Sequence, residues 1–430
     1  MTSSLRKPRK HPLRLAAMLG ALLWTGISGL AQDIMLPSDD YTPKLKKRKI
    51  PDRLPATPSV APAFSIPVTP LGFGAPGPNY LGRHDALVSL DFTDADHLLF
   101  TFRAPGLIHR TSDDGSREPR QMRAVVLKLP EGSLVSQTLW TVPGPDRYLW
   151  MLKNGSFLLR DREGLRIGDE KLEMRSFLPL PGALVALQID PSQKLLLTSS
   201  YEPTEEAASK SNGAASAVGE KTSNPSNIVL RIVDLGSGEV RATQRVTAAS
   251  ALPLGTDGHV VLTHDKLDRW SLRVNSFAGV SRILGHVEST CLPTSFLVSE
   301  REILITGCNP AHTPKLTAVS TTGQQLWETE IPAPVVPPLL LSSPDGSLLV
   351  RETVVLNEGV KLNAQTLWIK AVKGQVVRVF DAATGKLLLE TPASPAFDGG
   401  GNVAISPSGR RVAVLNDGNV QVFDLAAGSH

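Results

Sequence analysis

The chain has 430 residues, of which 41% are hydrophobic, so it is long enough to bury a large core in one domain or in two or three ordinary ones. Its formal charge of +4 comes from the first 31 residues, which hold five basic and no acidic side chains, and the remainder carries −1. A slightly acidic body argues against nucleic acid as the partner.

Residues 1–31 have the features of a secretory signal peptide. Basic residues between Arg6 and Arg14 precede the uncharged run LAAMLGALLWTGISGLA (15–31), which ends in small residues. The segment predicts export to the periplasm or the extracellular space, with no stable membrane insertion after cleavage. The alternative is an uncleaved anchor, because the 17-residue run is at the short limit of a membrane span. No cysteine follows the run, so lipid anchoring is not expected.

Residues 32–80 are rich in proline. Ten prolines lie between Pro37 and Pro78, together with the basic run KLKKRK (44–49), which we interpret as a solvated tail. This composition predicts an extended linker without helices. Its one short apolar stretch is FSIPV (64–68).

From Ala86 onward the pattern changes to short strands. Runs of four to seven mostly apolar residues, such as HLLFTFR, RAVVLKL and IVLRIVD, are separated by Gly, Pro, Asp and Ser. No helical period is present between residues 86 and 425, which indicates an all-β fold.

Many of these strands end in a similar turn, for example DLGSG (234–238) and DAATG (381–385). A type I turn closed by a left-handed glycine explains these residues, and the leading Asp accepts hydrogen bonds from the turn amides. The turns begin at Lys128, Asp169, Asp234, Asn275, Ser320, Asp381 and Asp424. Four of the six intervals are 41 to 45 residues, and the two long ones contain insertions at 202–227 and 357–375.

A period of about 40–45 residues built from four strands is typical of propeller blades. Seven turns predict a seven-bladed β-propeller of four-stranded antiparallel blades over 81–430. We expect the protein to be a monomer. The last repeat supplies only three strands, GNVAIS, RRVAVLN and NVQVFDL. Because folded proteins avoid long exposed strand edges, we expect a strand near 64–68 to pair with 419–425 and close the ring.

Two kinds of repeat carry a family resemblance. SPDGSLLV (343–350), VVRVFDAATGKLLLE (376–390) and SPSGRRVAVLNDGNVQVFDL (406–425) resemble the YVTN-type and WD-repeat-like propellers of secreted bacterial proteins. LTAVSTTGQQLWETEIP (316–332) is similar to the repeat of pyrroloquinoline-quinone proteins and of the related outer-membrane assembly factor. The resemblance to those quinone enzymes implies an eight-bladed ring with calcium ligands and adjacent cysteines. This chain has seven turns and no adjacent cysteines, so no cofactor is expected.

The two cysteines predict a disulfide. In STCLPTSFLVSEREILITGC, two strands meet at a turn centred on residues 299–300, which places Cys291 opposite Cys308 at disulfide distance. An exported chain favours a disulfide over two free buried thiols. The histidines show no ligand spacing, so no metal site is expected.

No catalytic residue can be assigned, because the common nucleophile and phosphate motifs are absent. The pairs His84-Asp85 and His264-Asp265 are interpreted as polar residues at strand ends rather than acid/base groups. Trp368, inside the second insertion, is the one binding candidate. The sequence favours a non-catalytic module that binds a protein or envelope polymer. The alternatives are an enzyme of lactonase, lyase or glycosidase type with its site at the central channel, and an envelope assembly scaffold.

Overall fold

In the computed structural model the described part of the chain is residues 52–425, apart from 75, 77–79, 83, 105–118, 181, 202–227, 247–252, 267, 309–313, 333–335, 337 and 361–367. The predicted signal peptide, the basic run 44–49 and the insertion 202–227 therefore lie outside the described residues.

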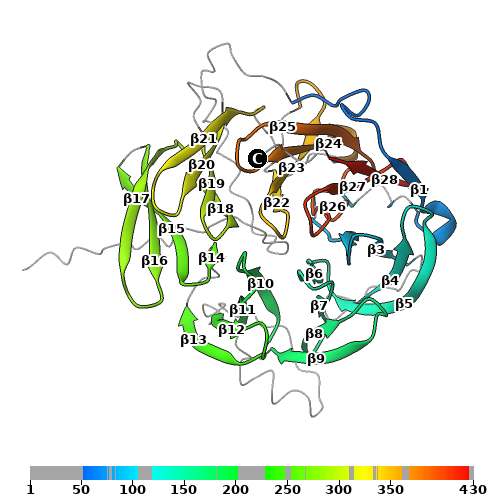
Figure 1. The fold of residues 1–430 in the computed structure, drawn as a ribbon, viewed down its shortest axis with the longest axis horizontal. Helices are drawn as coiled ribbons and strands as arrows, with labels where there is room; N and C mark the ends of the chain where they lie inside the picture. Colours follow the sequence, from blue (N-terminus) through cyan, green and yellow to red (C-terminus); the bar gives the residue numbers. More distant parts are fainter. Residues whose placement is uncertain are drawn as a thin grey trace, which may run out of the picture.

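Seven four-stranded antiparallel sheets form a ring, as the sequence predicts (Figure 1). Blade 1 comprises β2 (Val88–Phe92), β3 (His97–Arg103), β4 (Pro119–Lys128) and β5 (Ser133–Pro143). Blade 2 comprises β6 (Leu149–Met151), β7 (Phe157–Arg160), β8 (Gly164–Gly168) and β9 (Met174–Pro179). Blade 3 comprises β10 (Leu184–Ile189), β11 (Leu195–Tyr201), β12 (Ile228–Asp234) and β13 (Val240–Val246).

The remaining blades follow the same order, with the first strand innermost (Figure 1). Blade 4 comprises β14 (Leu254–Gly255), β15 (Gly258–Lys266), β16 (Arg269–Ser276) and β17 (Ser281–Glu288). Blade 5 comprises β18 (Thr294–Ser299), β19 (Glu302–Thr306), β20 (Lys315–Ser320) and β21 (Gln325–Glu330). Blade 6 comprises β22 (Leu339–Ser342), β23 (Leu348–Leu356), β24 (Val372–Asp381) and β25 (Leu387–Ala393).

Blade 7 is closed by the N-terminal strand. β26 (Val403–Ile405), β27 (Arg411–Asn416) and β28 (Asn419–Asp424) are followed on the outer edge by β1 (Phe64–Pro67). The pairing is antiparallel and aligns Phe64 with Val422 and Ile66 with Val420. The expected ring closure is therefore present, at the predicted residues. The 3-10 helix η1 (Thr69–Leu71) follows β1.

The repeated turns have the chemistry that the sequence indicates. Asp234 Oδ1 accepts hydrogen bonds from the backbone amides of Gly236 (3.1 Å) and Ser237 (2.9 Å), and Gly238 closes the turn at φ +75°. Asp381 accepts in the same way from Thr384 (2.8 Å). A left-handed glycine at this position lets the fourth strand return along the third.

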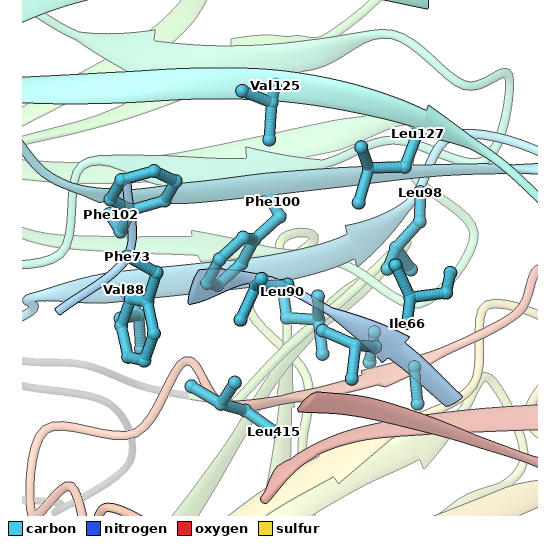
Figure 2. Close-up of a cluster of buried hydrophobic side chains, with 14 of the residues drawn as sticks. Ile66, Phe73, Val88, Leu90, Leu98, Phe100, Phe102, Val125, Leu127 and Leu415 are labelled. Atoms are coloured by element: carbon cyan, nitrogen blue, oxygen red, sulfur yellow. The ribbon is translucent and has the colours of Figure 1, made fainter. Parts of the chain in front are cut away.

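The core consists of apolar clusters between neighbouring blades. The cluster where blade 7 meets blade 1 contains Leu98, Phe100 and Leu127 of blade 1, Leu415 of β27 and Ile66 of β1 (Figure 2). Ile66 is 3% exposed. The closing strand thus completes a core as well as a sheet.

The residues before β1 also contact the ring. We call residues 52–67 the N-terminal strap. The strap runs along the outer edge of blade 6 and then joins blade 7 (Figure 1). Ser59 N donates to Glu390 O (2.8 Å), and Ala63 N donates to Val422 O (2.7 Å). The expected linker is therefore bound to the ring from Asp52 onward, because its prolines keep the chain extended and suited to lie along a strand edge.

The second insertion is shorter than the expected 357–375. β24 already begins at Val372, after the short helix α2 (Trp368–Ala371), and Val372 pairs with Leu356 of β23. Lys373, Gly374 and Gln375 interrupt the apolar pattern of this strand, and this interruption hid its beginning in the sequence.

Candidate binding face and central channel

The two faces of the ring differ in the length of their connections. The upper face is the one on which the second strand of each blade connects to the third. The lower face is the one on which turns join the first strand to the second and the third strand to the fourth. Every lower-face turn has two to five residues. On the upper face, connections of 15, 26, 8 and 15 residues leave blades 1, 3, 5 and 6. Long connections on a rigid scaffold commonly carry binding function, so the upper face is the candidate binding face.

Trp368 lies on this face, packed against the segment that enters blade 1. Its side chain is half-buried. A Cβ added to Gly82 would lie 2.4 Å from Trp368 Nε1, and Gly82 has φ +79°. Only glycine fits beneath the indole, so Trp368 is held in place and is not free to project from its connection.

Asp398 binds the same segment that enters blade 1. Its carboxylate accepts hydrogen bonds from the backbone amides of Gly82 (2.7 Å) and His84 (3.2 Å), and His84 Nδ1 lies 3.4 Å from Asp398 Oδ2. Burial raises the pKa of Asp398, and His84 partly opposes that rise. Tyr80 donates to Ala396 O (2.6 Å), and burial, then Asp398, raises the pKa of Tyr80 to about 12.

His84, Asp85 and Asp265 each have a charged partner that is not their neighbour in sequence. His84 faces Asp398, while Asp85 pairs with Arg120 at 3.0 Å. Asp265 lies 3.2 Å from His286.

The disulfide between Cys291 and Cys308 lies on the upper face, at the entrance to blade 5, with a Cα–Cα distance of 5.4 Å. Its register differs from the expected one. The β18–β19 ladder shifts between Leu297 and Ser299 and ends at the pair Thr294 and Thr306, so both cysteines lie beyond the ladder. Ser289 Oγ links them, because it accepts from Cys308 N (2.9 Å) and donates to Cys291 O (2.7 Å).

We expect the double variant Cys291→Ser/Cys308→Ser to lose about 3 kcal/mol of unfolding free energy, because the bridge closes a 17-residue separation in the unfolded chain. Urea unfolding measures this. The unmodified chain unfolded in reductant is the control and should match the double variant. An unchanged urea midpoint in the double variant would contradict the prediction.

The innermost strands carry half-buried side chains around the centre of the ring: Ser89, Asp91, Met151, Ile189, Phe296, Leu340 and Ile405. The apolar ones pack against the clusters between blades. The polar side is formed by blades 1 and 2, where Arg147 precedes β6 and is exposed.

Three charged groups from blades 1 and 6 and from the segment before β6 interact electrostatically. Burial raises the pKa of Asp91 to about 7, against the opposing effects of Ser89, whose Oγ donates at 2.6 Å, and of Arg147. Burial raises the pKa of Glu352 to about 8, again opposed by Arg147. Burial lowers the pKa of Arg147. Carboxyl groups that titrate near neutrality are suited to proton transfer or to hydrogen bonding with a ligand.

Glu352 belongs to a buried polar network. Gln375 Nε2 donates to Glu352 Oε2 (3.0 Å) and to Phe397 O (3.2 Å), and Gln375 Oε1 accepts from Phe397 N (3.0 Å) and Asn402 Nδ2 (2.7 Å). Gln375 thus fixes the connection from blade 6 to blade 7. It was expected in an insertion and instead lies in β24, the third strand of blade 6.

Sequence reasoning missed Asp91, Arg147 and Glu352. The sequence did contain one indication of Asp91. VSLDF is the first strand of a blade, and first strands lie innermost. Residues two apart in a strand lie on the same face, so Ser89 and Asp91 share a face. Within the described residues, no group of three or more His, Cys, Asp or Glu side chains is placed to hold a metal ion. No helix of that same part is long and apolar enough to span a membrane.

No protein-family model matches the chain, and no curated protein matches it in sequence. Solved structures resemble it in fold. The WD40 domain of Toxoplasma gondii coronin matches with 10% identity and a TM-score of 0.46, covering 89% of this chain and 90% of its own. The propeller domain of the trilobed protease from Pyrococcus furiosus matches with 12% identity and a TM-score of 0.42, covering 80% and 96%.

The Pyrococcus horikoshii acylaminoacyl peptidase matches with 12% identity and a TM-score of 0.45, over 80% of this chain. This chain spans only about half (52%) of the length of that peptidase. These likenesses concern the propeller fold alone.

Proposed function

We propose that this chain is an exported β-propeller that binds a protein or a cell-envelope polymer through its upper face. The observation that carries the proposal is the division of connection lengths: tight turns on the lower face, and connections of up to 26 residues on the upper face. The basic and apolar pattern of residues 1–31 and the disulfide Cys291–Cys308 support export. The resemblance to YVTN-type propellers of secreted bacterial proteins agrees with this.

The test compares upper-face and lower-face variants. We expect replacement of 202–227 by a short Gly-Ser linker, and Trp368→Ala, each to weaken binding to purified envelope polymer or to an isolated envelope protein at least tenfold. Binding is measured by co-sedimentation and by surface plasmon resonance. Glu131→Ala, on an exposed lower-face turn, is the matched control and should bind normally. If both upper-face variants bind like the unmodified chain, the proposal is wrong. An assembly scaffold differs only in its partner, which the same capture identifies.

A second candidate function is an enzyme at the channel. Asp91 and Glu352, whose pKa values burial raises to about 7 and about 8, support it. Lactone and glycan hydrolysis or elimination by the unmodified chain, lost in Asp91→Asn, would favour this function over the binding module.

A further inference from the structure

The outermost strand of blade 1, β5, is the longest of the seven outer strands, with 11 residues. It lies on the outer rim of the ring (Figure 1) and pairs with β4 on its inner side. In an antiparallel sheet, every second residue of such a strand points its backbone N–H and C=O away from the neighbouring strand. The outer edge of β5 therefore presents backbone donors and acceptors to a further strand.

This strand has no charged residue. Its sequence is SLVSQTLWTVP. The outer strands of blades 2, 3, 4 and 5 each expose charged side chains, among them Arg175, Arg241, Arg282 and Glu328. Charged side chains on an outer strand oppose pairing with another chain. Blade 1 lacks this protection along the whole of β5.

The outer edges of blades 6 and 7 are protected in other ways. The N-terminal strap runs along blade 6, where Ser59 N donates to Glu390 O (2.8 Å). The outer strand of blade 7 is β1, which has only four residues and ends in Pro67, a residue without an N–H. Of the seven outer strands, β5 is therefore the one that combines length with the absence of charge.

Apolar side chains lie along the same strand. Leu134, Val135 and Leu139 are 46%, 53% and 61% exposed. Trp140 belongs to the buried cluster with blade 2, so the residues that alternate with it point to the solvent face. Val135 lies at a bulge in the β4–β5 ladder, which bends the strand there without bringing a charge to its edge. The exposed side of β5 is thus apolar and uncharged.

The order of these residues fits a second copy of the same strand. If two copies pair antiparallel about a two-fold axis at Gln137, Val135 lies opposite Leu139 of the other copy, and Leu139 opposite Val135. Apolar side chains opposed in this way are in contact and stabilise the pair. The same arrangement on β13 would oppose Arg241 to Arg245, which are like charges.

We propose that the chain forms a two-fold symmetric dimer in which β5 of one copy pairs antiparallel with β5 of the other. The two copies of blade 1, with four strands each, then form one continuous sheet. The partner that this surface fits is therefore a second copy of the chain, and the protein is a dimer rather than the monomer expected from its sequence.

Sedimentation equilibrium of the full chain over about 1 to 100 µM tests the dimer. We expect a dissociation constant of about 10 µM, because one strand pair buries less surface than a standard interface. Leu139→Lys should raise it about tenfold or more, because the introduced ammonium would lie against Val135 of the other copy. Ile283→Lys makes the same change at a similarly exposed position of β17 (48%) and should leave the dissociation constant unchanged.

A single cysteine tests the register. Gln137→Cys should form a disulfide-linked dimer under mild oxidation by copper phenanthroline, because directly opposed residues of an antiparallel pair lie about 4.5–5.5 Å apart at Cα. Thr141→Cys, at an exposed position of the same strand, should remain a monomer on a non-reducing gel, because its opposed residue is Ser133. The native cysteines are already paired with each other.

Three results would overturn the proposal: a monomer at 100 µM, a dimer that Ile283→Lys weakens and Leu139→Lys does not, or no cross-link in Gln137→Cys. A monomer would leave the edge of β5 to a strand of some other protein. Thermal midpoints of the variants, measured alongside, separate loss of pairing from loss of folding. The dimer is independent of the upper-face proposal, since the 202–227 replacement leaves β5 unchanged and should still dimerise.

Discussion

Removal of the N-terminal strap together with Val68 is expected to lower the free energy of unfolding by about 5 kcal/mol or more. Without it, β28 becomes an exposed edge, and the buried surface of Ile66 and Val68 is opened to water at a cost of about 1.5–3 kcal/mol for each side chain. The measurement is urea unfolding of a chain that begins at Thr69. A chain that begins at Thr42 keeps every strap contact and is the control.

The strap also supplies the carboxylate of Asp52, which pairs with a buried arginine of blade 6. Arg351 of β23 and Arg378 of β24 lie directly opposite each other and are 0% and 5% exposed. Glu390 Oε2 lies 2.6 Å from Arg378 Nε, and Asp52 Oδ1 lies 2.8 Å from Arg378 Nη1. Burial lowers the pKa of Arg351 to about 10, and Asp52 opposes this. Two buried arginines at opposite positions of neighbouring strands therefore depend on a carboxylate from the strap.

Asp52→Asn removes the negative charge of Asp52 and leaves β1 unchanged, so it tests the effect of this charge alone. Removing one partner of a buried ion pair costs about 3 kcal/mol, here because the buried Arg351 and Arg378 would be left with Glu390 as their one carboxylate partner among those described. Asp96→Asn makes the same chemical change at an exposed pair, 4.0 Å from Arg411, and should cost less than about 1 kcal/mol. If the Asp52 and Asp96 variants have equal urea midpoints, the strap is held by β1 alone.

The fold was predictable because its information is local and repeated. The turns at Asp234 and Asp381 need an Asp and a left-handed glycine, and these residues are visible in any window of five. The closing strand was predictable from the need to cover the edge of β28. The strap contact between Asp52 and Arg378 was not, because it joins residues far apart in sequence and no local pattern indicates which carboxylate pairs with which arginine.

The channel was harder to predict for the same reason. Asp91, Arg147 and Glu352 come from blades 1, 2 and 6 and share no motif. The ring brings them together, and their altered pKa values depend on that enclosure. Local irregularities also displaced two predictions: a register shift in β18–β19 moved the disulfide outside the ladder, and polar residues at the start of β24 made it look like a loop.

Stability is expected to fall as the pH rises from 5 to 9, because burial raises the pKa values of Glu352 to about 8 and of Asp91 and Glu302 to about 7. Glu352 is the one of these three that we follow. Its pKa is 4.5 in the unfolded chain, and burial raises it to about 8 in the folded ring. Between these values the folded state binds the proton more tightly than the unfolded state. The contribution of Glu352 is therefore fully present below pH 4.5 and is lost as the pH passes 8. Each pKa unit corresponds to about 1.4 kcal/mol, which gives a loss of about 3 kcal/mol or more.

Glu352→Gln is expected to remove the part of this dependence that Glu352 contributes, while Asp91 and Glu302 keep theirs. A glutamine imitates the protonated acid, and its carbonyl oxygen can accept the same hydrogen bond from Gln375 Nε2. Urea unfolding at pH 5, 7 and 9 should give a shallower loss of stability for this variant, which becomes more stable than the unmodified chain at pH 9. Glu358→Gln, at an exposed upper-face position, should keep the original slope. Parallel pH curves for Glu352→Gln and the unmodified chain would mean that Glu352 is already ionised in the fold, and that Arg147 is neutralised by it.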